Sequence, residues 1–168
     1  MKDNSVCEPK NFDIIFASHA NDLRNYLYYK FGNLEIAEDI VQESYLKLWI
    51  NCAKVSIEKS KSYLFTIASN LFIDEKRHQK VVLKFQEKKT NSFHIESPEF
   101  ILEEKEFLIK LQNTLANLPS KQREVFLLNR IDKKKYAEIA EMLEISVKAV
   151  EKRMQKALLI IRKEIGNI

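Results

Sequence analysis

Apolar residues recur every three or four positions through the first half of the chain, a spacing typical of amphipathic helices. The first predicted helix ends at Gly32, because glycine readily takes the left-handed conformation that stops a helix. Asn33 can then cap a second helix that runs to about residue 51. Residues 52–61 break the pattern and are predicted to form a loop before a third helix at about 62–78. Three such helices can share one small core.

The second half of the chain opens with a stretch, residues 79–97, that lacks helical periodicity and is polar and basic, so we interpret it as a flexible linker. Pro98 suits the first position of the helix that follows. The predicted apolar stripe of this helix consists of Phe107, Leu108, Leu111, Leu115 and Leu118. Pro119 breaks the pattern, and another helix begins after it. The sequence therefore predicts an all-α protein with two small helical domains, residues 1–78 and 98–168.

The last third of the chain pairs a short helix with a longer one across a tight turn that contains neither glycine nor proline. The short helix is predicted at 136–143, and Ser146 is a suitable cap for the next, since its hydroxyl can accept a free backbone N–H. The predicted inward positions of the longer helix are Val147, Val150, Met154, Ala157, Leu158 and Ile161. This pattern predicts a helix-turn-helix, whose second helix fits the major groove of DNA. An ordinary helical hairpin with a solvated polar face would give the same pattern.

Charge is distributed unevenly along the chain. Residues 1–74 carry 8 Lys or Arg against 10 Asp or Glu, whereas residues 121–168 carry 12 against 7. The acidic N-terminal part and the basic C-terminal part suggest two surfaces with different partners. Charges that only solvate helix faces would also account for this distribution. The chain has two Gly and three Pro in 168 residues, too few turn-forming residues for an all-β fold.

The sequence offers little of the chemistry that metal or catalytic sites require. Cys7 and Cys52 lie far apart without a companion motif, so we expect neither a zinc site nor a disulfide framework. Cysteines without disulfides are consistent with a protein in a reducing compartment. The N-terminus lacks the apolar core of a signal peptide, and the longest apolar run is 157–161, so we expect a cytoplasmic protein. No catalytic spacing or glycine-rich phosphate loop is apparent, and we expect no enzyme activity, cofactor, metal or small-molecule substrate.

Four blocks of the sequence form recognisable motifs: AEDIVQESYLKLW (37–49), YLFTIASNLFIDEKR (63–77), LPSKQREVFLLNRID (118–132) and KYAEIAEMLEISVKAVEKRMQKAL (135–158). Taken together, they resemble the extracytoplasmic-function sigma factors, the minimal two-domain bacterial transcription initiation factors. They keep the family's order and spacing, and the resemblance extends from Phe12 to Arg162. It implies a protein that binds core RNA polymerase and directs promoter-specific transcription initiation, under the control of a membrane-associated anti-sigma factor.

In this family, the segment similar to the first block binds a coiled coil of the clamp in the largest polymerase subunit. The resemblance therefore makes candidate polymerase contacts of Asp39, Gln42, Glu43, Leu46 and Lys47. The residues themselves agree in part, because acidic and polar side chains at helical spacing form a strip suited to a basic partner. A solvated helix face is the alternative interpretation.

The segment similar to the second block captures the melted minus-ten promoter element. That task requires a pocket for an extruded base, aromatic or polar contacts to hold it, and cations for the backbone. The candidate residues implied by the resemblance are Ser62, Tyr63, Asn70, Asp74, Lys76 and Arg77. Tyr63 can equally be a core aromatic residue.

The helix-turn-helix of the family reads the minus-thirty-five promoter element. The positions that match its base-reading residues are Lys148, Glu151, Lys152, Gln155 and Lys156. Arg123, Arg130 and the lysines at 133–135 are candidate phosphate contacts. A stand-alone helix-turn-helix regulator, with the first domain used for dimerisation or signalling, is the alternative function.

Overall fold

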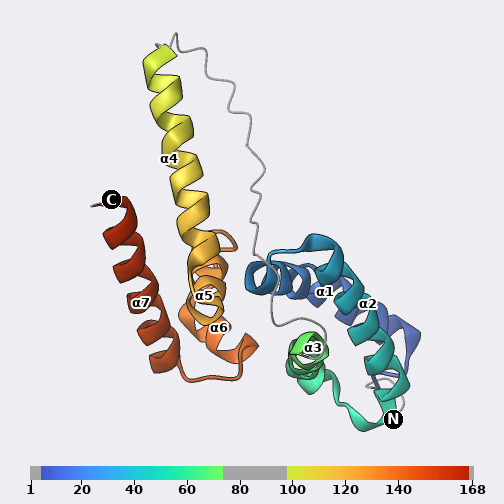
Figure 1. Cartoon of the computed structure of the whole chain (residues 1–168). Helices are drawn as coiled ribbons and strands as arrows, with labels where there is room; N and C mark the ends of the chain where they lie inside the picture. The colour runs from blue at the N-terminus through green and yellow to red at the C-terminus, as the bar shows by residue number, and fades with distance from the viewer. Residues whose placement is uncertain (1–4, 74–97, 167–168) are drawn as a thin grey trace.

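Apart from one isolated β-bridge, all regular structure in the described residues is helical, which confirms the predicted fold class. The computed structural model describes residues 5–73 and 98–166 of the chain. The helices form two groups that lie beside each other (Figure 1). The predicted linker, residues 79–97, lies outside the described residues, so the linker and the domain boundaries next to it stay predictions.

The first group contains α1 (Pro9–Phe31), α2 (Leu34–Ile50), the short 3₁₀ turn η1 (Cys52–Lys54) and α3 (Ile57–Ile73). Gly32 ends α1 with a φ of 73°, and its N–H donates to the carbonyl oxygen of Tyr28. The side chain of Asn33 accepts a hydrogen bond from the N–H of Ile36 at 3.0 Å and so caps α2. Both predicted boundaries are confirmed. The helices share a core that includes the fully buried Leu23, Leu27, Leu48, Leu64 and Ala68.

Helix α3 begins at Ile57, five residues before the predicted start, so the predicted loop 52–61 was too long. The first turn of α3 buries a serine, Ser60, whose hydroxyl donates to the carbonyl oxygen of Ile57 at 2.6 Å. A polar residue on the buried side hides the helical periodicity from a pattern of apolar positions. Glu58 in the first turn also interacts favourably with the positive end of the helix dipole.

A disulfide joins Cys7 to Cys52, and the expectation that these cysteines form none was wrong. Their Cα atoms lie 5.0 Å apart. The segment before α1 folds back over η1, where Ser5 and Ser56 form the isolated β-bridge and Val6 is fully buried. The fold thus brings together two cysteines that are 45 positions apart in the sequence. Because they are paired, the inference of a reducing compartment, which rested on unpaired cysteines, no longer holds.

The second group contains α4 (Pro98–Asn117), α5 (Ser120–Arg130), α6 (Tyr136–Met142) and α7 (Val147–Ile165). Its core includes the fully buried Leu118, Leu127, Leu128, Ile139, Met142 and Met154. Helix α4 extends beyond the other helices of this group (Figure 1). Its predicted apolar stripe is buried only at the end near α5, since Phe107 and Leu108 are 44% and 38% exposed.

The turn between α6 and α7 explains how the chain reverses without glycine or proline. Glu144 takes the left-handed conformation itself, with a φ of 51°. Ser146 then caps α7 as predicted, because its hydroxyl accepts a hydrogen bond from the N–H of Ala149 at 3.2 Å. Val150 and Met154 hold the inner face of α7 in the core, whereas Val147, predicted to face inward, is exposed. The helix-turn-helix geometry is confirmed.

Candidate nucleic-acid interface

Three of the predicted minus-ten residues share one face of α3. Ser62 and Tyr63 are half-exposed and line a hollow of about 530 Å³ beside η1. Asn70 is exposed and lines an adjacent hollow. Thr66, which the sequence analysis missed, lines both hollows and lies between these residues on the helix. The predicted residues Asp74, Lys76 and Arg77 lie outside the described residues.

The position of Tyr63 is compatible with both interpretations, a core aromatic residue and a base contact, and the base contact stays a prediction. It packs against the buried core and also lines the hollow. Two further cations line the hollow, Lys54 and Lys59, and both belong to the segment 52–61 that we expect to form the pocket together with Ser62 and Tyr63. A partly exposed aromatic ring beside lysines can stack on a base while the lysines contact phosphates.

The five predicted base-reading residues, Lys148, Glu151, Lys152, Gln155 and Lys156, are all exposed on α7. They stand opposite the buried residues Val150, Met154 and Ala157. Lysine, glutamate and glutamine at these positions can donate to or accept from base edges in a major groove. The geometry is therefore suited to the predicted role, and the individual contacts stay predictions.

Arg123 is not available to DNA in this conformation, and its predicted phosphate contact is contradicted. The residue is only 3% exposed. Its guanidinium donates to the carbonyl oxygens of Tyr29 and Lys30 at 2.7 Å, and to those of Ala116 and Leu118 at 2.8 Å. Burial lowers the pKa of Arg123. The cation thus satisfies carbonyls at the C-terminal end of α1, where the helix dipole favours positive charge.

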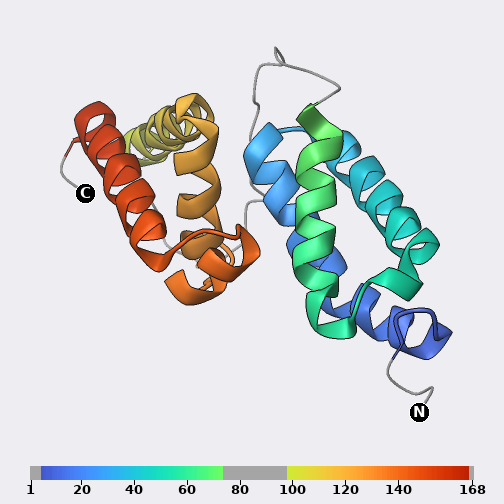
Figure 2. The same ribbon diagram turned by 90° about the horizontal axis from the view of Figure 1, so that it is seen from below.

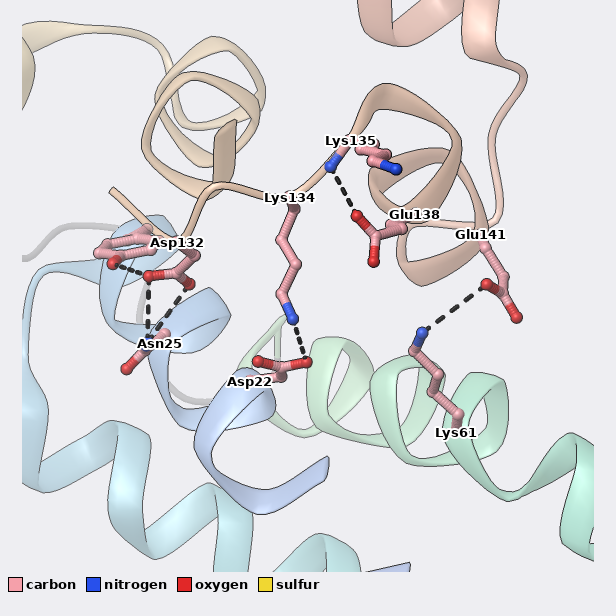
Figure 3. A network of polar contacts seen from close by, with 9 residues as sticks. Asp22, Asn25, Lys61, Asp132, Lys134, Lys135, Glu138 and Glu141 are labelled. Atoms are coloured by element: carbon pink, nitrogen blue, oxygen red, sulfur yellow. Dashed lines mark hydrogen bonds and ion pairs between the residues drawn. The ribbon is translucent and has the colours of Figure 1, made fainter. Parts of the chain in front are cut away.

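Besides the Arg123 contacts, further polar contacts lie along the boundary between the two helix groups (Figure 3). Lys134 Nζ lies 2.7 Å from Asp22 Oδ2, and the hydrogen bond raises the pKa of Lys134. Asp132 accepts a hydrogen bond from the hydroxyl of Tyr29 at 2.7 Å. Lys134, predicted as a phosphate contact, is therefore paired with the first helix group in this conformation.

The second helix group also touches α3 directly. Lys61 Nζ lies 3.7 Å from Glu141 Oε2, and the hydroxyl of Thr66 donates to Glu144 Oε2 at 3.0 Å. Figure 2 shows α6 and the turn after it on the side of the second group that faces α3. These contacts join segments more than 70 residues apart, and no local sequence signal predicts them.

The predicted polymerase contacts lie on the outer face of α2. Asp39, Gln42, Glu43 and Leu46 are exposed, and Lys47, half-exposed, pairs with Glu43 at 3.3 Å. Other exposed apolar side chains lie nearby and were not predicted as contacts. They are Trp49 and Ile50 on α2, and Phe16 of α1, which lines a hollow together with Gln42. Clustered exposed apolar residues mark surfaces that bind other proteins.

The described part of the chain offers neither a cluster of metal ligands nor a helix that could span a membrane. Within residues 5–73 and 98–166, no group of three or more His, Cys, Asp or Glu side chains lies close enough to hold a metal ion. No helix in the same ranges is both long and apolar enough to cross a membrane.

Known proteins resemble both helix groups. Residues 15–81 match the Sigma-70 region 2 family, and residues 108–161 match the Sigma-70 region 4 family. The chain is 30% identical over 160 residues to the ferric citrate uptake sigma factor FecI of Escherichia coli, covering 92% of each protein. It is also 30% identical over 152 residues to the ECF RNA polymerase sigma factor SigW of Bacillus subtilis, covering 84% of this chain and 81% of SigW.

Solved structures agree with this assignment at the level of the fold. The sigma factor RpoE of Bartonella quintana, in complex with the anti-sigma factor NepR, has a TM-score of 0.61 at 18% identity, covering 93% of this chain and 97% of its own. CnrH, in complex with the cytosolic domain of CnrY, has a TM-score of 0.60 at 24% identity, covering 90% and 85%. With its two matched sigma regions and its full-length relatives, the chain belongs to the extracytoplasmic-function sigma factors.

Proposed function

We propose that this protein binds core RNA polymerase and directs transcription initiation at specific promoters. The observation that carries the proposal is the combination, in one chain, of an exposed polar and apolar face on α2 with a helix-turn-helix whose polar face is exposed. Membership of a sigma-factor family supports the same function. Sigma factors are not enzymes, and the role proposed here is binding and positioning rather than chemical catalysis.

The outer face of α2 is proposed to bind the coiled coil of the largest-subunit clamp. Asp39 and Glu43 supply negative charge, while Leu46 and the neighbouring Trp49 supply apolar surface. An interface with a buried apolar centre and a charged rim gives affinity from the first and orientation from the second. The match of residues 15–81 to Sigma-70 region 2 favours this role over the alternative, a stand-alone regulator that uses the first domain for dimerisation or signalling.

The face of α3 is proposed to hold the melted minus-ten strand. Tyr63 provides a ring on which a base can stack, and Ser62 and Asn70 provide hydrogen-bonding groups beside it. Lys54 and Lys59 supply positive charge for phosphates. Asp74, Lys76 and Arg77, which follow the last described residue of α3, remain proposed contacts to the same element.

Helix α7 is proposed to read the minus-thirty-five element from the major groove. Lys148 and Glu151 lie in its first turns, where a recognition helix approaches base edges most closely. Lys152, Gln155 and Lys156 extend the same exposed face. Arg130 is exposed and remains a candidate phosphate contact.

Control by an anti-sigma factor is the remaining part of the proposal. The solved relatives RpoE and CnrH are each described in complex with a partner, the anti-sigma factor NepR and the cytosolic domain of CnrY respectively. We propose that a membrane-associated anti-sigma factor binds this protein in the cytoplasm, where core polymerase and promoter DNA are found.

Titration of the protein into labelled core polymerase tests the proposal. Replacing Asp39 and Gln42 together with alanine should weaken binding at least severalfold while leaving helicity unchanged, since both side chains are exposed. The control is Glu103→Ala with Glu106→Ala on α4, which also alters two exposed polar residues. Equal affinities for both double variants would remove the α2 face from the interface, and no binding by the wild-type protein would contradict the function.

A further inference from the structure

The disulfide holds the start of one wall of the hollow that is proposed to bind the minus-ten strand. Lys54 and Val55 line this hollow, at the last residue of η1 and the residue after it. Cys52 is the first residue of η1, so its bond to Cys7 fixes the same short segment. A 3₁₀ turn of three residues makes few hydrogen bonds of its own. The position of this wall therefore depends on contacts with other parts of the chain.

A second link holds the end of the same wall. Ser5 and Ser56 form the isolated antiparallel β-bridge, and Ser56 directly follows the last residue of the wall. Val6, between the bridge and the disulfide, is fully buried. The carbonyl oxygen of Ser5 accepts a hydrogen bond from the side chain of Asn11 on α1 at 2.9 Å. We call residues 5–7 the strap, since they join the wall to α1.

Without the disulfide, one backbone bridge and one buried valine would hold the strap to the wall. Segments with few buried contacts and few backbone hydrogen bonds open locally at a low cost in free energy. Lys54 and Val55 would then lose their fixed position relative to Tyr63, which lines the same hollow from α3. A site that becomes ordered only on binding holds its ligand less tightly than a site already in place.

The disulfide is open to attack by small thiols. Cys7 and Cys52 are each partly exposed. They are the only cysteines of the chain, so a reductant changes this bond alone. The proposed function requires the cytoplasm, where thiols are kept reduced, and a disulfide in that compartment is usually transient and redox-sensing. The bond is therefore suited to a regulatory role.

We propose that Cys7 and Cys52 form a reversible thiol–disulfide site that controls how well the protein opens promoters. In the oxidised protein the strap fixes the wall of the hollow, and the melted minus-ten strand is captured efficiently. In the reduced protein the wall is loose and capture is weaker, while the outer face of α2 still binds polymerase. This inference rests on the proposed function of the α3 face as the minus-ten site.

Exchange with a small dithiol or a small disulfide interconverts the two states. One thiolate of the dithiol attacks a sulfur of the Cys7–Cys52 bond, and its second thiolate then displaces that sulfur from the mixed disulfide. The protein gains two electrons and two protons, and the dithiol is oxidised to a disulfide. The reverse exchange with a small disulfide restores the bond and releases two small thiols.

The test compares promoter opening by oxidised and reduced protein, each bound to core polymerase, at a temperature below both melting transitions. The probe is duplex promoter DNA with 2-aminopurine in the minus-ten element, whose fluorescence rises when the strands separate. We expect oxidised wild type to open about fivefold more promoter than wild type treated with dithiothreitol. The affinity for labelled core polymerase should be equal in the two states. A bond that only stabilised the fold would leave promoter opening unchanged under these conditions.

The Cys7→Ser, Cys52→Ser double variant is the control for effects of dithiothreitol on the polymerase. It should open promoters to the same extent as reduced wild type, with or without dithiothreitol. A second measurement does not depend on the folding of this variant. Reoxidation of reduced wild type with oxidised glutathione should restore promoter opening to the level of the untreated protein.

Equal opening by oxidised and reduced wild type would overturn the inference, and so would an equal loss of opening and of polymerase affinity on reduction. The proposed function is judged separately, by transcription with the oxidised protein. Transcripts that do not respond to reduction would contradict the redox site alone. The absence of transcripts with oxidised protein would contradict the proposed function and, with it, this inference.

Discussion

Arg123 on α5 donates a hydrogen bond from Nε to the backbone carbonyl oxygen of Tyr29, near the end of α1, at 2.7 Å. The same guanidinium also bonds three other carbonyl oxygens, so a single side chain links the two helix groups and the end of α4. A residue that the sequence suggested for DNA is in this conformation a structural connector between domains.

Replacing Arg123 with alanine should destabilise the protein by about 3 kcal/mol, because buried carbonyls would lose a charged donor. Urea denaturation followed by circular dichroism measures the change. Arg130→Ala is the control, since Arg130 is exposed on the same helix and should change stability by no more than about 0.5 kcal/mol. Equal effects of the two substitutions would show that the Arg123 contacts contribute little.

The disulfide between Cys7 and Cys52 should stabilise the first helix group by about 2–4 kcal/mol, because it closes a long loop in the unfolded chain. Thermal melts of the oxidised protein should therefore lie above those of the protein treated with a reductant. The Cys7→Ser, Cys52→Ser double variant should melt like the reduced protein and should not respond to reductant. Coincident melts of oxidised and reduced wild type would contradict the prediction.

The Arg123 contacts and the Cys7–Cys52 disulfide are features of this fold that the sequence did not predict. Gly32, Asn33 and Ser146 act on backbone groups within a few residues, so local patterns located the boundaries of α1, α2 and α7. The Cys7–Cys52 bond and the Arg123 contacts depend on how distant segments pack. The early start of α3 escaped notice because its first turn buries a serine instead of an apolar residue.

The candidate site was predictable to a similar extent. Helical spacing placed the reading positions of α7 on one face, and the family resemblance supplied their roles. Thr66 carries no sequence signal of its own, since threonine on a helix is usually a solvated residue. The covering of Thr66 by Glu144 depends on the docking of two domains, which periodicity within one helix does not encode.

Stability should fall as the pH is lowered below about 6.5, in part because of His19. Burial, followed by the charge of Lys61, lowers the pKa of His19, while Asp22 and Glu141 act in the opposite direction. The unfolded chain then takes up a proton at a higher pH than the folded protein, so the stabilising contribution is present above 6.5 and lost on acidification. His19→Gln should flatten the dependence of melting temperature on pH between about 5.5 and 7.5. An unchanged slope would contradict the assignment.

Lys152→Ala should leave the fold intact, since Lys152 is exposed on α7. If the side chain contacts a base edge, the loss should be about 1–3 kcal/mol and concentrated at one base pair of the minus-thirty-five element. A phosphate contact would instead give a uniform loss and a shallower salt dependence. Transcription from single-base promoter variants at two salt concentrations separates these outcomes. If the substitution changes neither the base preference nor the salt dependence, Lys152 does not contact the DNA.

Ser146→Ala provides the contrast to Lys152→Ala, because it removes the cap of α7 and no base-reading group. It should lower stability by about 1 kcal/mol and affect all promoter variants alike. Urea denaturation and the same promoter set measure both effects. A loss confined to one base pair would mean that Ser146 itself takes part in reading the sequence.

The most direct test of the function is reconstituted transcription with purified core polymerase and a library of bacterial promoter fragments. We predict that adding the protein yields transcripts from a defined subset of fragments, with shared sequences near minus ten and minus thirty-five. The Asp39→Ala, Gln42→Ala variant should lose most of this activity. A transcript pattern identical with and without the protein, together with binding of the protein alone as a dimer to duplex DNA, would contradict the account.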